Sequence, residues 1–179
     1  MEEFIMTTAN KLTLLRIALI PVFLGVLYAG FPGARYWALA VFIIASLTDF
    51  LDGYIARHYN QITNFGKFMD PLADKVLVMA AMCWFVECGQ MPGWVLATVL
   101  LREFSVSGMR LVAVEQGKVI AAAWSGKVKT FATMICLCLM MLDIPKTLNI
   151  ICIGIILVTT LYSGIEYLIK NKEVFKNAD

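Results

Sequence analysis

Six apolar runs, each about long enough to cross a bilayer as a helix, dominate this sequence and leave only short links between them. They lie at residues 12–29, 36–57, 70–88, 93–114, 126–142 and 148–169. A helical crossing takes about 20 residues, so six crossings would use about 120 residues of the chain. Hydrophobic residues make up 60% of the sequence, whereas soluble domains contain about half. The pattern predicts an all-α integral membrane protein with six transmembrane helices, forming a single domain over residues 1–179, and argues against a water-soluble fold.

Short links join the first run to the second, the third to the fourth and the fifth to the sixth. They contain the turn-forming residues Gly30, Pro32, Gly33, Gly89, Pro92, Gly93, Asp143 and Pro145. If the spans alternate, these turns share one side of the membrane and carry only Arg35 and Lys146. Every other Lys and Arg except Arg102 falls on the opposite side. The positive-inside rule therefore places both termini in the cytoplasm.

The first eleven residues have no basic segment ahead of an apolar one, so we do not expect a cleaved signal peptide. This stretch mixes Phe4, Ile5 and Met6 with two glutamates, which suits either a short interfacial segment or a disordered start. The formal net charge of +2 gives no reason to expect a nucleic-acid partner. The five cysteines lack the paired spacing of a zinc site.

Four aspartates, Asp49, Asp52, Asp70 and Asp74, fall within or at the start of the second and third apolar runs. An ionised side chain near the centre of a membrane helix costs about 2.5–3.5 kcal/mol, so such residues are functional candidates. Spacings of three and four residues place each pair on one helix face. Helices joined by a short link usually pack together, so the two pairs are expected to converge.

Four converging carboxylates would repel one another unless protons or cations neutralise them. Their oxygen atoms suit Mg²⁺ or Mn²⁺, and two such ions would balance the formal charge. Gly53, Ala56 and Gly66 leave space for a bulky ligand. The cluster thus predicts a metal-dependent phosphate site. The simpler alternatives are that Asp70 before Pro71 caps a helix, and that Asp52 forms a surface pair with Arg57.

The same region resembles the signature of the CDP-alcohol phosphotransferase family. The residues that carry the resemblance are Asp49, Asp52, Gly53, Ala56, Arg57, Gly66, Asp70 and Asp74, all at the spacing of that signature. The segment Asn10–Arg16 is similar to the one that opens the first helix in this family, although Ala9 stands where proline is usual. Two later segments, Arg102–Arg110 and Trp124–Thr130, are similar to those of bacterial members that use glycerol 3-phosphate.

The resemblance implies a six-helix membrane enzyme of phospholipid synthesis in the bacterial cytoplasmic membrane, acting as a homodimer. Two divalent cations, Mg²⁺ or Mn²⁺, would be held by Asp49, Asp52, Asp70 and Asp74. Asp74 would also act as general base on the acceptor hydroxyl, which attacks CDP-diacylglycerol and releases CMP. The residues implied in binding the CDP-lipid are Gly53, Ala56, Arg57, Gly66, Asn10 and Thr13.

Glycerol 3-phosphate is a small dianion, so its site needs guanidinium or ammonium groups. The candidates are Arg102, Arg110, Lys127 and Lys129, of which Arg102 lies deepest in its span. Arg102 could instead form an ion pair with Glu103, and the other three could be interface anchors that reach the headgroups. An inositol phosphate or serine remains an alternative acceptor. In a different class, the aspartates could line the path of a divalent-cation transporter.

Overall fold

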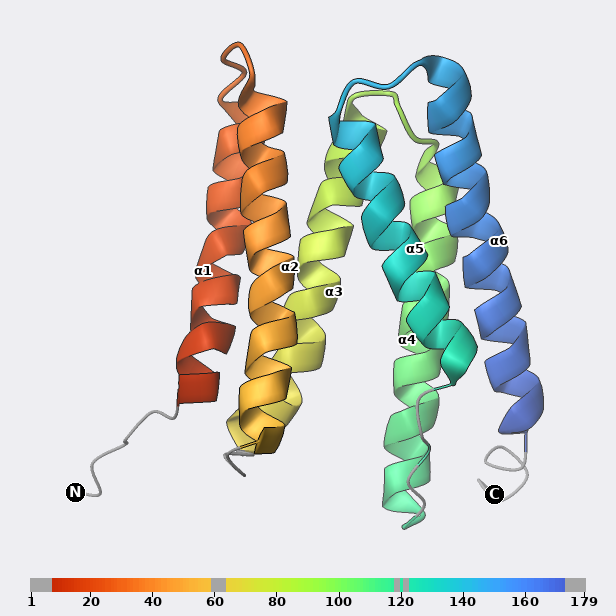
Figure 1. The fold of residues 1–179 in the computed structure, drawn as a ribbon. Coiled ribbons are helices and arrows are strands. Elements are labelled where there is room, and N and C mark those ends of the chain that lie inside the picture. The colour runs from red at the N-terminus through yellow and green to blue at the C-terminus, as the bar shows by residue number, and fades with distance from the viewer. Residues whose placement is uncertain (1–7, 59–63, 118–119, 121–122, 173–179) are drawn as a thin grey trace. The chain divides into compact units, whose positions relative to one another are not determined.

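The computed structural model describes residues 8–58, 64–117, 120 and 123–172, and within these only the backbone of residues 8–11, 49–58, 64–68, 70, 71 and 74. The secondary structure of the described residues consists of six α-helices (Figure 1). They are α1 (Thr8–Tyr28), α2 (Ala34–His58), α3 (Asn64–Glu87), α4 (Gly93–Glu115), α5 (Trp124–Met141) and α6 (Lys146–Lys170). The predicted all-α class and the six helices are confirmed.

Two helices begin earlier than the apolar runs predicted. Helix α1 begins at Thr8 rather than at residue 12, and α3 begins at Asn64 rather than at residue 70. The remaining ends lie within two residues of the prediction. Hydropathy marks only the apolar part of a helix, whereas the backbone hydrogen bonds continue through a polar first turn. The Asp-Pro pair at 70–71 therefore lies within α3 and does not start it.

The chain divides into two compact units, residues 1–81 and 82–179, with the boundary inside α3. In the first unit, α1 and α2 pack as an antiparallel pair (Figure 1). The buried stripe of α2 contains Ala38, Phe42 and Ala45, and Phe42 contacts Phe23 of α1 with ring centroids 5.7 Å apart. Buried residues at intervals of three or four form the stripe that one helix presents to another.

In the second unit, α6 packs against both α4 and α5. The buried stripes of these helices are apolar near the short turns, where they contain Val95, Val99, Leu137, Met140, Cys152, Ile153 and Ile156. Toward the other end, which we call the polar half, polar residues join the apolar Val106, Met109 and Ala113 of α4; they are Glu103, Lys129, Thr133, Thr160, Ser163 and Tyr167. The polar half lies where α4 and α6 end and α5 begins, so all three helices contribute to it.

The outward faces of the second unit are apolar, with Leu101, Phe104, Phe131 and Val158 each at least two-thirds exposed. Such faces suit a hydrocarbon surrounding. By length and composition α6 could cross a membrane, and it is the one helix among the described residues that meets both criteria. Shorter apolar helical stretches occur at Leu12–Tyr28 and Ala34–Thr48.

Candidate functional site

All four predicted metal-binding aspartates lie within helices of the first unit. Asp49 and Asp52 belong to α2, and Asp70 and Asp74 belong to α3. Because Asp70 is the seventh residue of α3, the alternative that it caps the start of that helix is wrong. The aspartate side chains lie outside the described atoms. Among the side chains that are described, no group of three or more His, Cys, Asp or Glu could hold a metal ion.

The packing of α1 on α2 places two buried polar residues beside the first aspartate pair. Both helices rise by about 1.5 Å per residue in opposite directions, so the Phe23–Phe42 contact sets the register. Seven residues from that contact, Arg16 is approximately level with Asp49, and Thr13 is level with Asp52. Both Thr13 and Arg16 are almost completely buried. A buried guanidinium is retained where anionic or other accepting groups surround it.

Thr13 was expected to contact the CDP-lipid, whereas the sequence indicated for Arg16 only a charge on the cytoplasmic side. The burial of Arg16 therefore could not be predicted from the distribution of charges along the sequence. The other predicted CDP-lipid residues are placed by their backbone alone. Asn10 lies in the first turn of α1, Gly53, Ala56 and Arg57 in the last turns of α2, and Gly66 in the first turn of α3. Their roles stay predictions.

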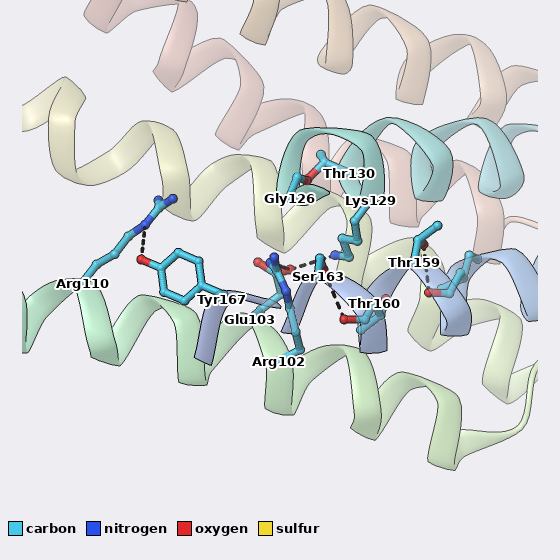
Figure 2. A network of polar contacts seen from close by, with 11 residues as sticks. Arg102, Glu103, Arg110, Gly126, Lys129, Thr130, Thr159, Thr160, Ser163 and Tyr167 are labelled. Carbon is cyan, nitrogen blue, oxygen red and sulfur yellow. Dashed lines mark hydrogen bonds and ion pairs between the residues drawn. The ribbon is translucent and has the colours of Figure 1, made fainter. Parts of the chain in front are cut away.

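Two of the predicted acceptor-binding cations meet in the polar half of the second unit. Arg102 Nη1 and Lys129 Nζ both donate to Glu103 Oε1, each at 2.8 Å (Figure 2). We call Arg102, Glu103 and Lys129 the charge cluster. The alternative of an ion pair between Arg102 and Glu103 is thus confirmed. This ion pair does not neutralise the charge cluster, because two cations and one carboxylate leave one net positive charge.

Buried polar atoms without a hydrogen-bond partner occur on the helices that form the polar half. Thr133 and Thr160 are buried, and their hydroxyl oxygens have no hydrogen-bond partner among the described residues; the same holds for Arg102 Nε. Buried polar atoms in native proteins normally have a partner. The unpartnered Arg102 Nε belongs to a cluster with a net positive charge, an arrangement that an anion would satisfy.

Two glycines make room for the arginine of this cluster. A Cβ atom on Gly164 would lie 3.1 Å from Arg102 Cγ, and one on Gly126 would lie 3.4 Å from its Nη2. The first distance is shorter than an ordinary van der Waals contact, and the second is at the lower limit of one. Helices α5 and α6 therefore approach the Arg102 side chain closely because these positions lack side chains.

The other two candidate cations lie apart from the cluster. Arg110 Nε donates to Tyr167 Oη at 3.3 Å, and the guanidinium carbon lies 5.8 Å from the centre of the tyrosine ring. Lys127 is exposed, with its Nζ 6.0 Å from the ring of the exposed Trp124. That pairing suits an anchor at the membrane surface, where aromatic and basic side chains gather.

Sequence reasoning did not identify Ser163, Gly164 and Tyr167 as part of this region. A faint signal exists, because a serine, a glycine and a tyrosine fall within five residues of a largely apolar helix. Hydropathy alone does not separate such residues from ordinary packing residues. Only the approach of α4 to α6 shows that Gly164 and Tyr167 lie against the arginines.

Comparisons with known proteins identify relatives of this chain. A family model described as CDP-alcohol phosphatidyltransferase matches residues 6–162. A CDP-diacylglycerol--glycerol-3-phosphate 3-phosphatidyltransferase of Bacillus subtilis is 41% identical, covering 95% of this chain and 97% of the relative. A probable phosphatidylglycerophosphate synthase of Mycobacterium tuberculosis is 38% identical over 89% of this chain and 78% of its own. An Escherichia coli protein with the same name as the Bacillus protein is 44% identical, covering 70% of this chain and 71% of the relative.

Proposed function

Because the chain belongs to the CDP-alcohol phosphatidyltransferase family, we propose that it transfers the phosphatidyl group of CDP-diacylglycerol to sn-glycerol 3-phosphate. The products are phosphatidylglycerophosphate and CMP, so the protein is a transferase of phospholipid biosynthesis. The observation that carries this conclusion is the 41% identity, over 95% of the chain, to a relative named for that activity. The family match decides against the alternative of a divalent-cation transporter.

Members of this family generally depend on a metal ion. Carboxylate oxygens are ligands that suit Mg²⁺ and Mn²⁺, so the donor set of Asp49, Asp52, Asp70 and Asp74 fits two such ions. Bound there, the ions would neutralise the negative charge that builds up on the phosphates during transfer. The spacing of each pair within a helix supports this assignment.

In the proposed reaction, Asp74 accepts the proton of an acceptor hydroxyl. The oxygen of that hydroxyl forms a bond to the phosphorus that carries the diacylglycerol. The bond between this phosphorus and the oxygen shared with the CMP phosphate breaks, and CMP leaves with the electron pair. Removing the proton makes the hydroxyl oxygen a better nucleophile, which is why a carboxylate is needed beside it.

The remaining residues of the first unit would hold the CDP-lipid. Gly53, Ala56 and Gly66 would leave room for the CDP group, and Arg57 would neutralise part of its diphosphate. Asn10 and Thr13 would contribute from α1, and the burial of Thr13 level with Asp52 supports a role for it there.

The second unit would bind the phosphate of the acceptor through Arg102, Arg110 and Lys129, whereas the exposed Lys127 beside Trp124 would be an anchor at the membrane surface. The charge cluster supports this role because it keeps one net positive charge in buried surroundings. An anion interacts more strongly with such a charge than it would in water. An uncharged acceptor, such as inositol, gives no reason to bury this charge.

We also propose that all six helices cross the bacterial cytoplasmic membrane, with both termini in the cytoplasm and a short interfacial segment before α1. The helices are 18–25 residues long, which is close to the length of one crossing. This topology puts the polar half of the second unit at the cytoplasmic end, where glycerol 3-phosphate is found. A homodimer is the assembly that we expect.

The experiment that tests the function measures CMP release from CDP-diacylglycerol by the purified protein with a panel of acceptors. We expect release with glycerol 3-phosphate and Mg²⁺ or Mn²⁺, and loss of release after chelation of the metal. Faster release with serine or an inositol phosphate would overturn the assignment of the acceptor. No release with any acceptor would overturn the proposed activity itself.

A further inference from the structure

Two residues of α6 contact the arginines of α4, and we propose that Gly164 and Tyr167 are positioning residues for the phosphate of the acceptor. This inference rests on the proposed function, in which Arg102 and Arg110 bind that phosphate. Both residues lie beyond the segment that the family model matches, which ends at residue 162. They also lie on one face of α6, three residues apart.

Tyr167 is a fixed support for Arg110. Its side chain is 2% exposed and belongs to a small core with Val106 and Met109 of α4. The hydroxyl oxygen accepts from Arg110 Nε at 3.3 Å, and the ring lies 5.8 Å from the guanidinium carbon (Figure 2). A long, exposed arginine loses much rotamer freedom when it binds a ligand. A partner that already holds the guanidinium removes part of that cost.

The contact with Tyr167 also decides which nitrogens of Arg110 remain for a ligand. Nε is engaged with the hydroxyl, whereas neither terminal nitrogen has a partner among the described residues. Two parallel N–H groups on a planar guanidinium match two oxygens of a phosphate. The class of ligand that suits this arrangement is a phosphomonoester dianion.

Gly164 acts on Arg102 by leaving space. A Cβ atom at this position would lie 3.1 Å from Arg102 Cγ, so any larger residue pushes the arginine stem away from α6. The same stem places Nη1 2.8 Å from Glu103 Oε1. A shift of the stem therefore moves the guanidinium relative to Glu103 and Lys129, which together set the charge of the cluster.

The test compares the kinetics of variants in α6 with those of matched controls in the same helix. Tyr167→Phe removes the hydroxyl and keeps the ring, Tyr167→Leu removes both, and Gly164→Ala adds the Cβ atom. Tyr162→Phe is the matched tyrosine control, because Tyr162 is 65% exposed. Gly154→Ala is the matched glycine control, because a Cβ there would meet nothing within 4 Å.

We expect the KM for glycerol 3-phosphate to rise about threefold in Tyr167→Phe, which corresponds to the loss of one modest hydrogen bond. It should rise about tenfold in Tyr167→Leu, where the cation–π contact is lost as well. Gly164→Ala should raise the same KM about threefold, since a displaced arginine loses part of one hydrogen bond. In these variants the KM for CDP-diacylglycerol and the kcat should stay within about twofold of wild type. In both control variants the KM for glycerol 3-phosphate should also stay within about twofold of wild type.

A further variant separates positioning from general packing. In Arg110→Met the side chain has no hydrogen-bond donor, so adding Tyr167→Phe should have no further effect on KM if the hydroxyl acts through Arg110. An additional rise in the double variant would overturn the inference. So would an unchanged KM for glycerol 3-phosphate in Tyr167→Leu, or an equal rise in KM for both substrates. Absence of glycerol 3-phosphate-dependent CMP release by the wild-type protein would instead overturn the proposed function.

Discussion

The two halves of the core formed by α4, α5 and α6 have different compositions for different reasons. Near the short turns, Val95, Leu137 and Ile156 are completely or almost completely buried among other apolar side chains. In the opposite half, Glu103 and Lys129 are almost as deeply buried but carry charge. Apolar packing stabilises a fold directly, whereas a buried ion pair often contributes nothing net compared with apolar residues of the same size. Stability therefore gives no reason for the charged half, and the proposed binding of the acceptor phosphate would supply one.

This comparison predicts that changes in the two halves affect different measurements. A truncation in the apolar half should lower the stability and leave the substrate affinities alone. Loss of a charge in the polar half should weaken the binding of glycerol 3-phosphate. Loss of the base in the first unit should reduce turnover.

The largest effect is expected for Asp74→Asn in α3. An amide cannot accept the proton of the acceptor hydroxyl, and general base catalysis contributes about 10²–10⁴-fold to a rate. We expect kcat for CMP release to fall by about that factor, with the thermal unfolding midpoint close to that of wild type. Turnover near the wild-type rate in the purified variant would show that Asp74 is not the base.

An intermediate effect is expected for Leu137→Ala in the apolar half. This side chain is completely buried, and truncating such a leucine costs about 2–5 kcal/mol of unfolding free energy. The midpoint of thermal unfolding in detergent should fall clearly, while the KM values of the folded protein stay unchanged. A selective rise in the KM for glycerol 3-phosphate would break the division between the two halves.

The most selective effect is expected from a pair of lysines two residues apart on α5. Lys129→Met removes a buried ammonium that is 2.8 Å from Glu103, and it cancels the net charge of the cluster. The KM for glycerol 3-phosphate should rise about tenfold or more, in line with the loss of a charged hydrogen bond. Lys127→Met, the matched control at an exposed position, should change it by about twofold or less. Equal effects of the two variants would place the acceptor phosphate elsewhere.

Much of the fold could be predicted because hydropathy and turn residues act locally. The turns at Gly30 and Gly33 have positive φ values of 63° and 86°, a conformation that glycine adopts without strain. The start of α3 could not be read in this way. The Asp70-Pro71 pair looks like a helix start, yet the helix already begins at Asn64, since a polar turn can be helical when the rest of the helix supports it.

The candidate site could be predicted in part. The four aspartates and Arg102 were singled out because charge in an apolar span is expensive, and this cost is a property of the sequence itself. Arg110, Lys127 and Lys129 were singled out by the family resemblance and by the negative charge of the acceptor. The partners of the cations were harder to predict. Glu103 adjoins Arg102 in the sequence and was considered as its partner, whereas the contact of Tyr167 with Arg110 joins residues 57 positions apart.

The sequence by itself determined that this chain forms apolar helices, which of their residues carry charge and to which enzyme family it belongs, because these properties depend on residue type and spacing along the chain. Only the tertiary structure decided that Arg102 and Lys129 share Glu103, that Arg16 is buried and that α6 supports the arginines of α4. The physical reason is that the rotation and register of packed helices depend on many weak contacts acting together. Such contacts determine which distant residues meet, and no local pattern in the sequence records them.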